Sequence, residues 1–452
     1  MGASTTQRAS DRIDELRDAF VAGLATFVSQ PSVSATGEGI RDCAGWLAGQ
    51  MRELGIAVEV LETGGQPLVY GRIGQGAPRL VVYGHYDVQP AGPLDAWVTP
   101  PFEPAVRDGA MYGRGVGDNK GQLLAHLYAL RAWLDVHGEP PPFELVFVFD
   151  GEEEIGSPAT EAFIEAHPER FRGDYVVCAD GSTLGVPGPA IFLAIRGLLY
   201  LELTARGAPA GWASGSYGGF LPNPVQRVAA AVASLVDARG HVLVEGFYAG
   251  AAEPTDELRA LGAALPADFV GGAAAYGVER FIHERPLDAM LFEPHISACG
   301  IDGGYTGEGV MMTVPAAARA KLDVTFVSGQ SADALVDRIR EHLDRHGFED
   351  VELDALMRCG PIALEPRHEL VELVAEASAS VWGERPVLIP SIAGGGPFAA
   401  FAETLGVPTL VVPYAQHDLH EHSPDEHLRL DWYRNGIKTS AALYARLAAR
   451  GA

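Results

Sequence analysis

Five short segments of the sequence place a histidine or an acidic residue at or just beyond the predicted end of a strand. They are His85-Tyr86-Asp87, Asp118 in GRGVGDNKG, Glu152-Glu153-Glu154 in DGEEEIGS, Asp180 in CADG, and His422 in HEHSPDE. Imidazoles and carboxylates without a thiolate suit Zn²⁺, Mn²⁺ or Co²⁺. Two such ions, bridged by a carboxylate, can hold a hydroxide that attacks an amide carbon while another carboxylate transfers the proton. The five segments therefore predict a two-metal site.

The elements around these segments form the pattern of an α/β sheet. Apolar runs typical of buried strands lie at residues 79–84, 143–149, 175–179 and 409–413, and helical patterns lie at 10–28, 42–54, 119–136, 158–166, 366–382 and 430–449. A sheet of this kind is covered by helices on both faces and binds ligands beyond the carboxyl ends of its strands. A single loop acid there is usually a turn former or helix cap, but five candidates at one edge indicate a metal site.

The middle of the chain has a different pattern. Residues 198–206 and 318–327 alternate like half-exposed strands, and residues 224–237 and 331–346 have the periodicity of helices. We therefore expect an α+β domain at residues 198–357, inserted into a catalytic domain formed by residues 1–197 and 358–452. The predicted fold class is α/β, with a mixed central sheet flanked by helices and an inserted α+β domain.

The composition excludes some partners. The 452 residues include 33 Lys and Arg against 59 Asp and Glu, a net charge of −26, which argues against nucleic acid and anionic membranes as partners. No run of 18 apolar residues and no signal-peptide core occurs in the sequence. Four scattered cysteines without a CxxC pair argue against a thiolate zinc site and favour a reducing cytoplasm.

The candidate segments, taken in order, resemble the carnosinase-like dipeptidases, which belong to a metallopeptidase family that also contains aminoacylases and succinyl-diaminopimelate desuccinylases. The similarity extends over nearly the whole chain, through the following blocks: HYDVQP from His85, Trp97, Pro101-Phe102, GRG and DNKG around Asp118, EEIGS from Glu153, Asp180, VEGFY from Val244, Gly300-Ile301, GGYTG from Gly303, and HSPDE from His422. It implies that the inserted domain is a lid and that two copies of the chain form a homodimer through it.

The resemblance also implies the roles of the site residues. Five of them would be metal ligands: His85 and Asp180 on one ion, Glu154 and His422 on the other, and Asp118 between the two. Asp87 would accept the second N–H of the His85 ring, and Glu153 would be the general base. We interpret Glu152 as a solvated loop acid. His417 and His420 compete with His422 as ligands, but the HSPDE context favours His422.

Four departures from the family pattern concern the groups that contact the substrate. They are Ala213 where a histidine polarises the scissile carbonyl, Thr325 where an arginine binds the substrate carboxylate, Met312 where a threonine is expected, and Gly394-Gly395-Gly396-Pro397 where the loop has a serine and a preceding arginine. Because the ligands and base are complete, we expect the same chemistry on a substrate other than a free dipeptide. Alternatively, the lid segments are misaligned, and Arg206, Arg319, His295 or His283 takes over a missing role.

The sequence thus predicts a hydrolase that depends on two divalent metal ions, Zn²⁺ or else Mn²⁺ or Co²⁺. It would cleave an amide C–N bond of a peptide-like or N-acyl small molecule, with a metal-bridged hydroxide as nucleophile and Glu153 as base. One alternative is a biosynthetic enzyme that uses the same site to rearrange, condense or cyclise a metabolite. A metal-binding protein without catalysis is a third hypothesis.

Overall fold

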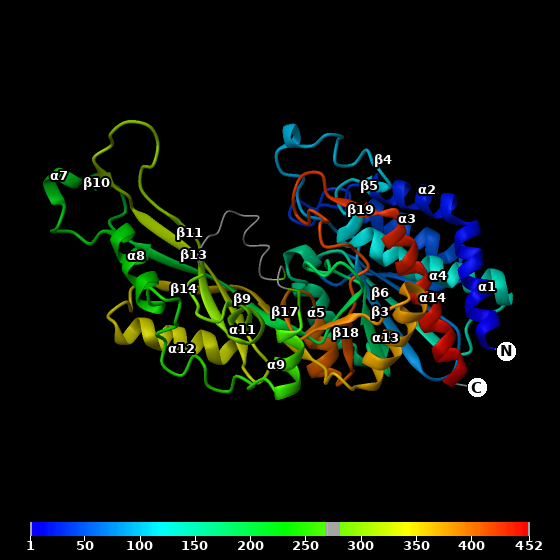
Figure 1. The fold of residues 1–452 in the computed structure, drawn as a ribbon. Coiled ribbons are helices and arrows are strands. Elements are labelled where there is room, and N and C mark those ends of the chain that lie inside the picture. Colours follow the sequence, from blue (N-terminus) through cyan, green and yellow to red (C-terminus); the bar gives the residue numbers. More distant parts are fainter. Residues whose placement is uncertain (1, 267–268, 270–280, 451–452) are drawn as a thin grey trace.

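The computed structural model describes residues 2–266, 269 and 281–450. Its larger part contains both ends of the chain and is built on an eight-stranded sheet (Figure 1). The strand order is β1 (Ala57–Leu61), β2 (Leu68–Ile73), β6 (Glu144–Asp150), β3 (Arg79–His85), β7 (Tyr175–Cys178), β18 (Thr409–Val411), β8 (Ala190–Phe192) and β16 (Val387–Ile389). The four central strands, from β6 to β18, are parallel to one another. The strands that flank them, β2 beside β6 and β8 beside β18, run antiparallel to their neighbours. This arrangement confirms the predicted mixed sheet.

Helices cover both faces of this sheet. Alternate residues of β3 show why its sequence is apolar throughout: Leu80 and Val82 pack into one core cluster, and Val81 and Tyr83 into the other. The first cluster includes α1 (Gly2–Glu15), α2 (Arg17–Val28), α3 (Ile40–Glu53), α4 (Gly121–His137), α13 (Glu369–Trp382) and α14 (Leu430–Arg450). The second includes α5 (Pro158–Ala166) and α6 (Pro168–Phe171).

The predicted strands and helices of this part are present, with one error. The single helix expected over residues 10–28 is two helices, α1 and α2, which are separated at Leu16. The apolar periodicity continues through the break because residues of both helices, such as Ile13 and Phe20, are buried in the same cluster. Periodicity therefore identified the buried face but not the point at which the helix axis changes.

A second sheet lies in the smaller part of the structure, which projects from the larger part (Figure 1). Its order is β11 (His295–Asp302), β13 (Ala317–Phe326), β9 (Ala194–Arg206) and β14 (Glu352–Cys359), all antiparallel. Helices α8 (Pro224–Leu235) and α12 (Ala332–Arg345) pack with it around a third apolar cluster. The inserted α+β part is thus confirmed. The predicted boundaries after residues 197 and 357 fall inside β9 and β14, and we keep them as a proposal.

Strand β9 connects the two parts. Its first residues pair with β15 (Ile362–Ala363) and β17 (Ile392–Ala393), which follow the lid in the sequence. From Gly197 onward it pairs with β13 of the lid. None of the described helices is long and apolar enough to cross a membrane.

Candidate metal centre

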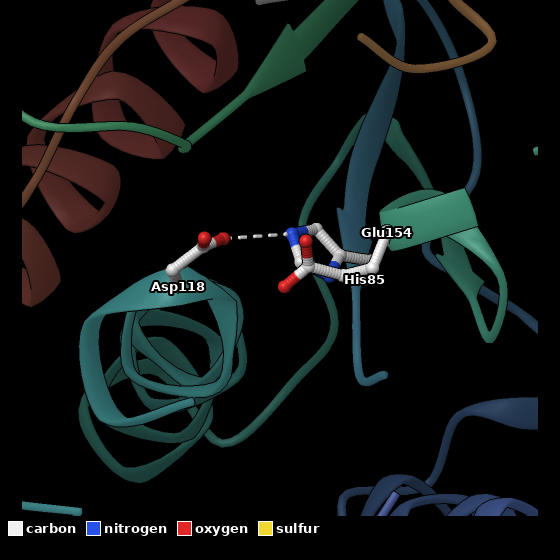
Figure 2. A group of neighbouring side chains, drawn as sticks. All are labelled: His85, Asp118 and Glu154. Carbon is white, nitrogen blue, oxygen red and sulfur yellow. Dashed lines mark hydrogen bonds and ion pairs between the residues drawn. The ribbon is translucent and has the colours of Figure 1, made fainter. Parts of the chain in front are cut away.

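The predicted site residues lie beyond the ends of three neighbouring parallel strands, as the sequence indicated. His85 is the last residue of β3, the turn with Glu153 and Glu154 follows β6, and Asp180 follows β7. Asp118 comes from the short helical turn η2 (Val116–Lys120) that precedes α4. Figure 2 shows Asp118 at this helical turn and His85 and Glu154 on the opposite side of the space between them. The sheet therefore brings together side chains that are far apart in the sequence.

Asp118 lies between two imidazoles. One of its carboxylate oxygens is 3.1 Å from His85 Nε2, and the other is 2.9 Å from His422 Nε2. His422 Nε2 is also 3.1 Å from a carboxylate oxygen of Glu154. The side chain of His85 is fully buried, whereas that of His422 is 49% exposed. The two imidazoles thus approach one shared carboxylate, one from the core and one from the surface.

Two further carboxylates face His85. Oxygens of Glu153 and Asp180 are each 3.8 Å from His85 Nε2. Asn119 donates a hydrogen bond of 2.7 Å to the second oxygen of Asp180, so that carboxylate is held toward the site. All seven residues selected from the sequence therefore lie in one place or, for Asp87, directly behind it.

Asp87 is buried and has two kinds of contact. Its Oδ1 is 3.4 Å from His85 Nδ1, and its backbone carbonyl oxygen is 3.1 Å from the same nitrogen. Its carboxylate also accepts the backbone N–H groups of Glu153 and Glu154, at 3.2 and 3.1 Å. Asp87 therefore connects the end of β3 to the acidic turn, and it lies beside the imidazole that it was expected to orient.

The interpretation of Glu152 as a solvated acid was wrong. Its side chain is buried, and its two oxygens accept backbone N–H groups of Ala159, Thr160 and Gln66 at 2.6, 2.7 and 3.1 Å. Ala159 and Thr160 lie in the first turn of α5, where helix N–H groups have no partner within the helix. Glu152 thus caps α5 and fixes the turn that carries its two acidic neighbours.

Sequence reasoning missed the role of Glu426. This buried carboxylate accepts hydrogen bonds from the Arg114 guanidinium at 2.8 Å and from the backbone N–H groups of Gly115, Gly117 and Asp118 at 2.9, 3.0 and 3.2 Å. It therefore fixes the loop that presents Asp118. The only sequence signal was its position at the end of the HSPDE segment.

Within the described chain, two groups of donor atoms are close enough to hold an ion. Donor atoms of His85, Asp118 and Glu154 lie within 4.8 Å of one another, as do those of Asp118, Glu421 and His422. The groups share Asp118, and the sequence had not selected Glu421. Neither His417 nor His420 belongs to these groups; both are exposed, and the His420 ring lies edge-on against the His427 ring at 5.2 Å.

The electrostatics of the cluster fit cations. Burial, together with the nearby charges of Asp180, Glu154 and Asp118, raises the pKa of Glu153 well above its usual value, against the opposing effect of His85. Hydrogen bonds to Asp118 and Glu154 raise the pKa of His422 to about 11. So many carboxylates in one buried space repel one another unless positive charge is added. Nitrogen and oxygen donors without sulfur suit Zn²⁺, Mn²⁺ or Co²⁺.

Of the positions expected to contact substrate, Gly394 and Gly395 lie beside the acidic cluster, but those of the inserted domain lie elsewhere. Ala213 is exposed on β10 (Trp212–Ala213), and Thr325 is buried on β13, opposite His295 of β11. His295 and His283 line a separate cavity together with Arg196. Of the proposed replacements, Arg206 pairs with Glu352 at 2.8 Å, and Arg319 is exposed. The structure brings none of these groups to the metal centre.

Comparison with known proteins identifies the family. Residues 81–446 match the model of peptidase family M20/M25/M40. The chain belongs to this family. It is 27% identical to rat Beta-Ala-His dipeptidase, over 98% of this chain and 96% of that protein. It is also 27% identical to the Cys-Gly metallodipeptidase of Schizosaccharomyces pombe, over 94% and 95% of the two chains.

Two solved structures are similar over nearly the whole chain. An M20 metallo-carboxypeptidase from Sulfolobus solfataricus has a TM-score of 0.90 at 31% identity, covering 95% of this chain and 99% of that one. Human carnosine dipeptidase 1 has a TM-score of 0.84 at 26% identity, covering 98% and 100%. The predicted class, a metal-dependent hydrolase of an amide bond, is therefore confirmed, and nothing in these comparisons supports the non-hydrolytic alternative.

Proposed function

We propose that the chain binds two divalent cations, Zn²⁺ or else Mn²⁺ or Co²⁺, to cleave an amide C–N bond of a peptide-like or N-acyl small molecule. Five side chains would hold the ions: His85 and Asp180 one of them, Glu154 and His422 the other, and Asp118 both. The observation that carries this proposal is the position of Asp118, whose two carboxylate oxygens face different imidazoles at 3.1 and 2.9 Å. A carboxylate in this position is the bridge that a two-ion site needs.

The ions and the side chains around them have different roles in the proposed hydrolysis. When bound, the ions supply Lewis acidity, which polarises the scissile carbonyl and makes a water acidic enough to attack at neutral pH. Glu153 accepts the proton of that water and delivers it to the leaving amine, because its carboxylate faces the site and burial raises its pKa. Asp87 orients both the His85 ring and the backbone of Glu153.

The proposed substrate does not need a carboxylate that an arginine at position 325 would bind. Thr325 is buried and its hydroxyl lies 3.4 Å from a carboxylate oxygen of Asp323, so this position offers no positive charge. An Arg–carboxylate contact is a charged, often bidentate interaction that a threonine cannot replace. The two relatives compared above are dipeptidases, and we propose that this chain cleaves related amides without selecting for a free C-terminal carboxylate.

We further propose a cytoplasmic homodimer that assembles through the lid. All four cysteines are free, which suits a reducing compartment. The far end of the lid exposes large apolar side chains: Phe220 is 81% exposed, Val310 89% and Met312 71%. An exposed apolar patch of this kind is typical of a protein interface. Sedimentation equilibrium measures the oligomeric state directly. A monomer at micromolar concentration would exclude this homodimer.

Two variants test the catalytic proposal. Glu153→Gln keeps the size of the side chain but removes the base, so kcat on an amide substrate falls by about 10²–10⁴-fold while the metal content stays at two ions. Asp118→Ala removes the shared ligand, so metal content falls together with activity. Metal analysis and rates on a panel of N-acyl amides, dipeptides and dipeptide amides distinguish the variants. If Glu153→Gln keeps most of its turnover, this role of Glu153 is wrong.

A further inference from the structure

A cavity of about 190 Å³ adjoins the metal centre. The acidic cluster contributes to its lining, with Asp118, Glu153, Asp180 and His422. The apolar part of the lining, called the apolar wall below, consists of Phe192, Ile195, Ile392, Phe398 and Val411, together with Gly394 and Gly395. The scissile amide, once at Glu153, must therefore place one of its substituents against an apolar wall.

The apolar wall is built by strand pairing. Ile195 of β9 lies directly beside Ile392 of β17, and Phe192 at the end of β8 lies beside Val411 at the end of β18. Phe192, Ile195 and Val411 are at most 3% exposed, so the sheet and its core hold them in place. Such a wall is preformed, and a ligand need not spend free energy on ordering it.

The two glycines in this wall leave space next to the base. A Cβ atom at Gly395 would lie 3.6 Å from Glu153 Oε1, and one at Gly394 would lie 3.2 Å from Ile195 Cγ2. Neither glycine has a φ angle in the left-handed region that favours glycine, so the backbone does not require glycine at these positions. What their lack of a side chain provides is room at the reacting bond.

We propose that this cavity is the subsite for an uncharged apolar substituent of the amide substrate, and that Gly395 sets the size it accepts. The inference rests on the proposed hydrolysis and specifies its substrate class. No lysine or arginine is among the described residues that line the cavity, and a carboxylate bound there would face Glu153 and Asp180. An aliphatic or aromatic group gains free energy from burial there, whereas an anionic group loses its hydration without a lysine or arginine in the lining to pair with.

The first test measures kcat/KM of the metal-loaded protein on two series of neutral amides. One series varies the acyl side chain from Gly through Ala and Val to Leu, and the other varies the amine side in the same way. The series whose substituent enters the cavity gains about fourfold in kcat/KM per buried methylene group, and the other stays nearly flat. Replacing the preferred Leu by the similarly sized but charged Asp lowers kcat/KM by more than tenfold.

The second test reduces the space at Gly395. Gly395→Ala makes an ordinary contact with Glu153 and should fold, while Gly395→Val occupies more of the cavity. In both variants the ratio of kcat/KM for the Leu substrate to that for the Gly substrate falls, by at least tenfold in Gly395→Val, while the Gly substrate is still cleaved. Gly45→Ala is the matched control, because a Cβ at this exposed glycine of α3 meets nothing within 4 Å.

The outcomes separate this inference from the proposed function. If no member of either series is cleaved in a metal-dependent way, the proposed hydrolysis fails and the subsite with it. If the amides are cleaved but neither series depends on side-chain size, or if Asp is preferred to Leu, the subsite alone is refuted. A size preference that Gly395→Val leaves unchanged would show that Gly395 does not set it.

Discussion

A carboxylate oxygen of Glu426 accepts the backbone N–H of Asp118 at 3.2 Å, although 308 positions separate these residues in the chain. Glu426 belongs to the loop that also carries His422, so one buried side chain holds together the loops of two proposed ligands. The Arg114 guanidinium, 2.8 Å from the same carboxylate, balances its charge in the core. The distance between Asp118 and His422 therefore depends on a residue that contacts neither imidazole in the site.

The variant Glu426→Gln tests this relationship. We expect metal affinity to fall by about 10–100-fold, as for other residues that orient ligands. The free energy of unfolding should also fall, because breaking a buried ion pair costs about 3–5 kcal/mol. Metal titration and chemical denaturation measure the two effects. The exposed Glu38→Gln is the control, and an unchanged metal affinity in Glu426→Gln would contradict the proposed role.

Removal of the metals should abolish activity without unfolding the protein. The proposed ligands lie at the edge of a sheet whose strands and covering helices form two large apolar clusters, and those clusters contain none of these ligands. Dialysis against a chelator should give a folded, inactive protein, and Zn²⁺, Mn²⁺ or Co²⁺ should restore its activity. Circular dichroism and an amide hydrolysis assay check both statements. Unfolding on chelation would mean that the ions hold the fold together, as they do in small zinc domains.

Asp150, behind the acidic turn, should make stability depend on pH. Burial, together with the nearby charge of Asp87, raises the pKa of Asp150 from 3.8 to about 6 in the folded protein. Because the folded-state pKa is the higher one, the stability gained by protonation is fully present below about pH 4 and is lost as pH rises through about 6. Relative to Asp150→Asn, the unmodified protein should lose roughly 3 kcal/mol of unfolding free energy over this range.

Urea denaturation of both metal-free proteins at several pH values measures this difference. Working without metal removes the separate pH dependence of metal binding. The comparison with Asp150→Asn cancels the contribution of the other carboxylates, which titrate in both proteins. If the difference between the two proteins does not change between pH 4 and 7, Asp150 does not titrate in this range.

A free carboxylate on the substrate should bring no advantage. Because Thr325 is buried and uncharged, the protein cannot gain the roughly 1.5–3 kcal/mol that a hydrogen bond to a charged group contributes at that position. We expect poor cleavage of β-alanyl-histidine, and kcat/KM for a dipeptide no higher than for its C-terminal amide. Steady-state rates on the pair provide the measurement. A strong preference for the free acid would mean that another basic side chain, such as Arg196, binds the carboxylate.

Sequence patterns were sufficient to predict the strands and helices, whose side chains follow a regular periodicity. Uninterrupted apolar strands such as residues 143–149 require cover on both faces, and polar residues at their ends meet at one edge, so His85, Glu153 and Asp180 could be placed together. The alternating pattern at 318–327 likewise indicated a sheet with one exposed face. These inferences depend only on which face of a single strand each side chain points to, and the order of residues in that strand determines this.

The remaining errors concern contacts between segments. Glu152 is as acidic as Glu153 and Glu154, and only the position of α5 turns it inward as a helix cap. Glu426 and Glu421 acquire their places from the path of the loop after β18, which has no periodicity. The break at Leu16 leaves the apolar spacing intact. No single-segment pattern contains this information.

The position of β9 has a consequence for how this protein can diverge. Ile195 lines the cavity beside the metal centre, whereas the next residue, Arg196, lines the cavity that also contains His295. Neighbouring residues of a strand point to opposite faces, so a shift of β9 by one residue would exchange the two. Point substitutions at Ile195 can adjust specificity in small steps. A deletion of one residue just before Ile195 would bring the Arg196 guanidinium into the apolar wall and change the chemistry of the cavity in a single step.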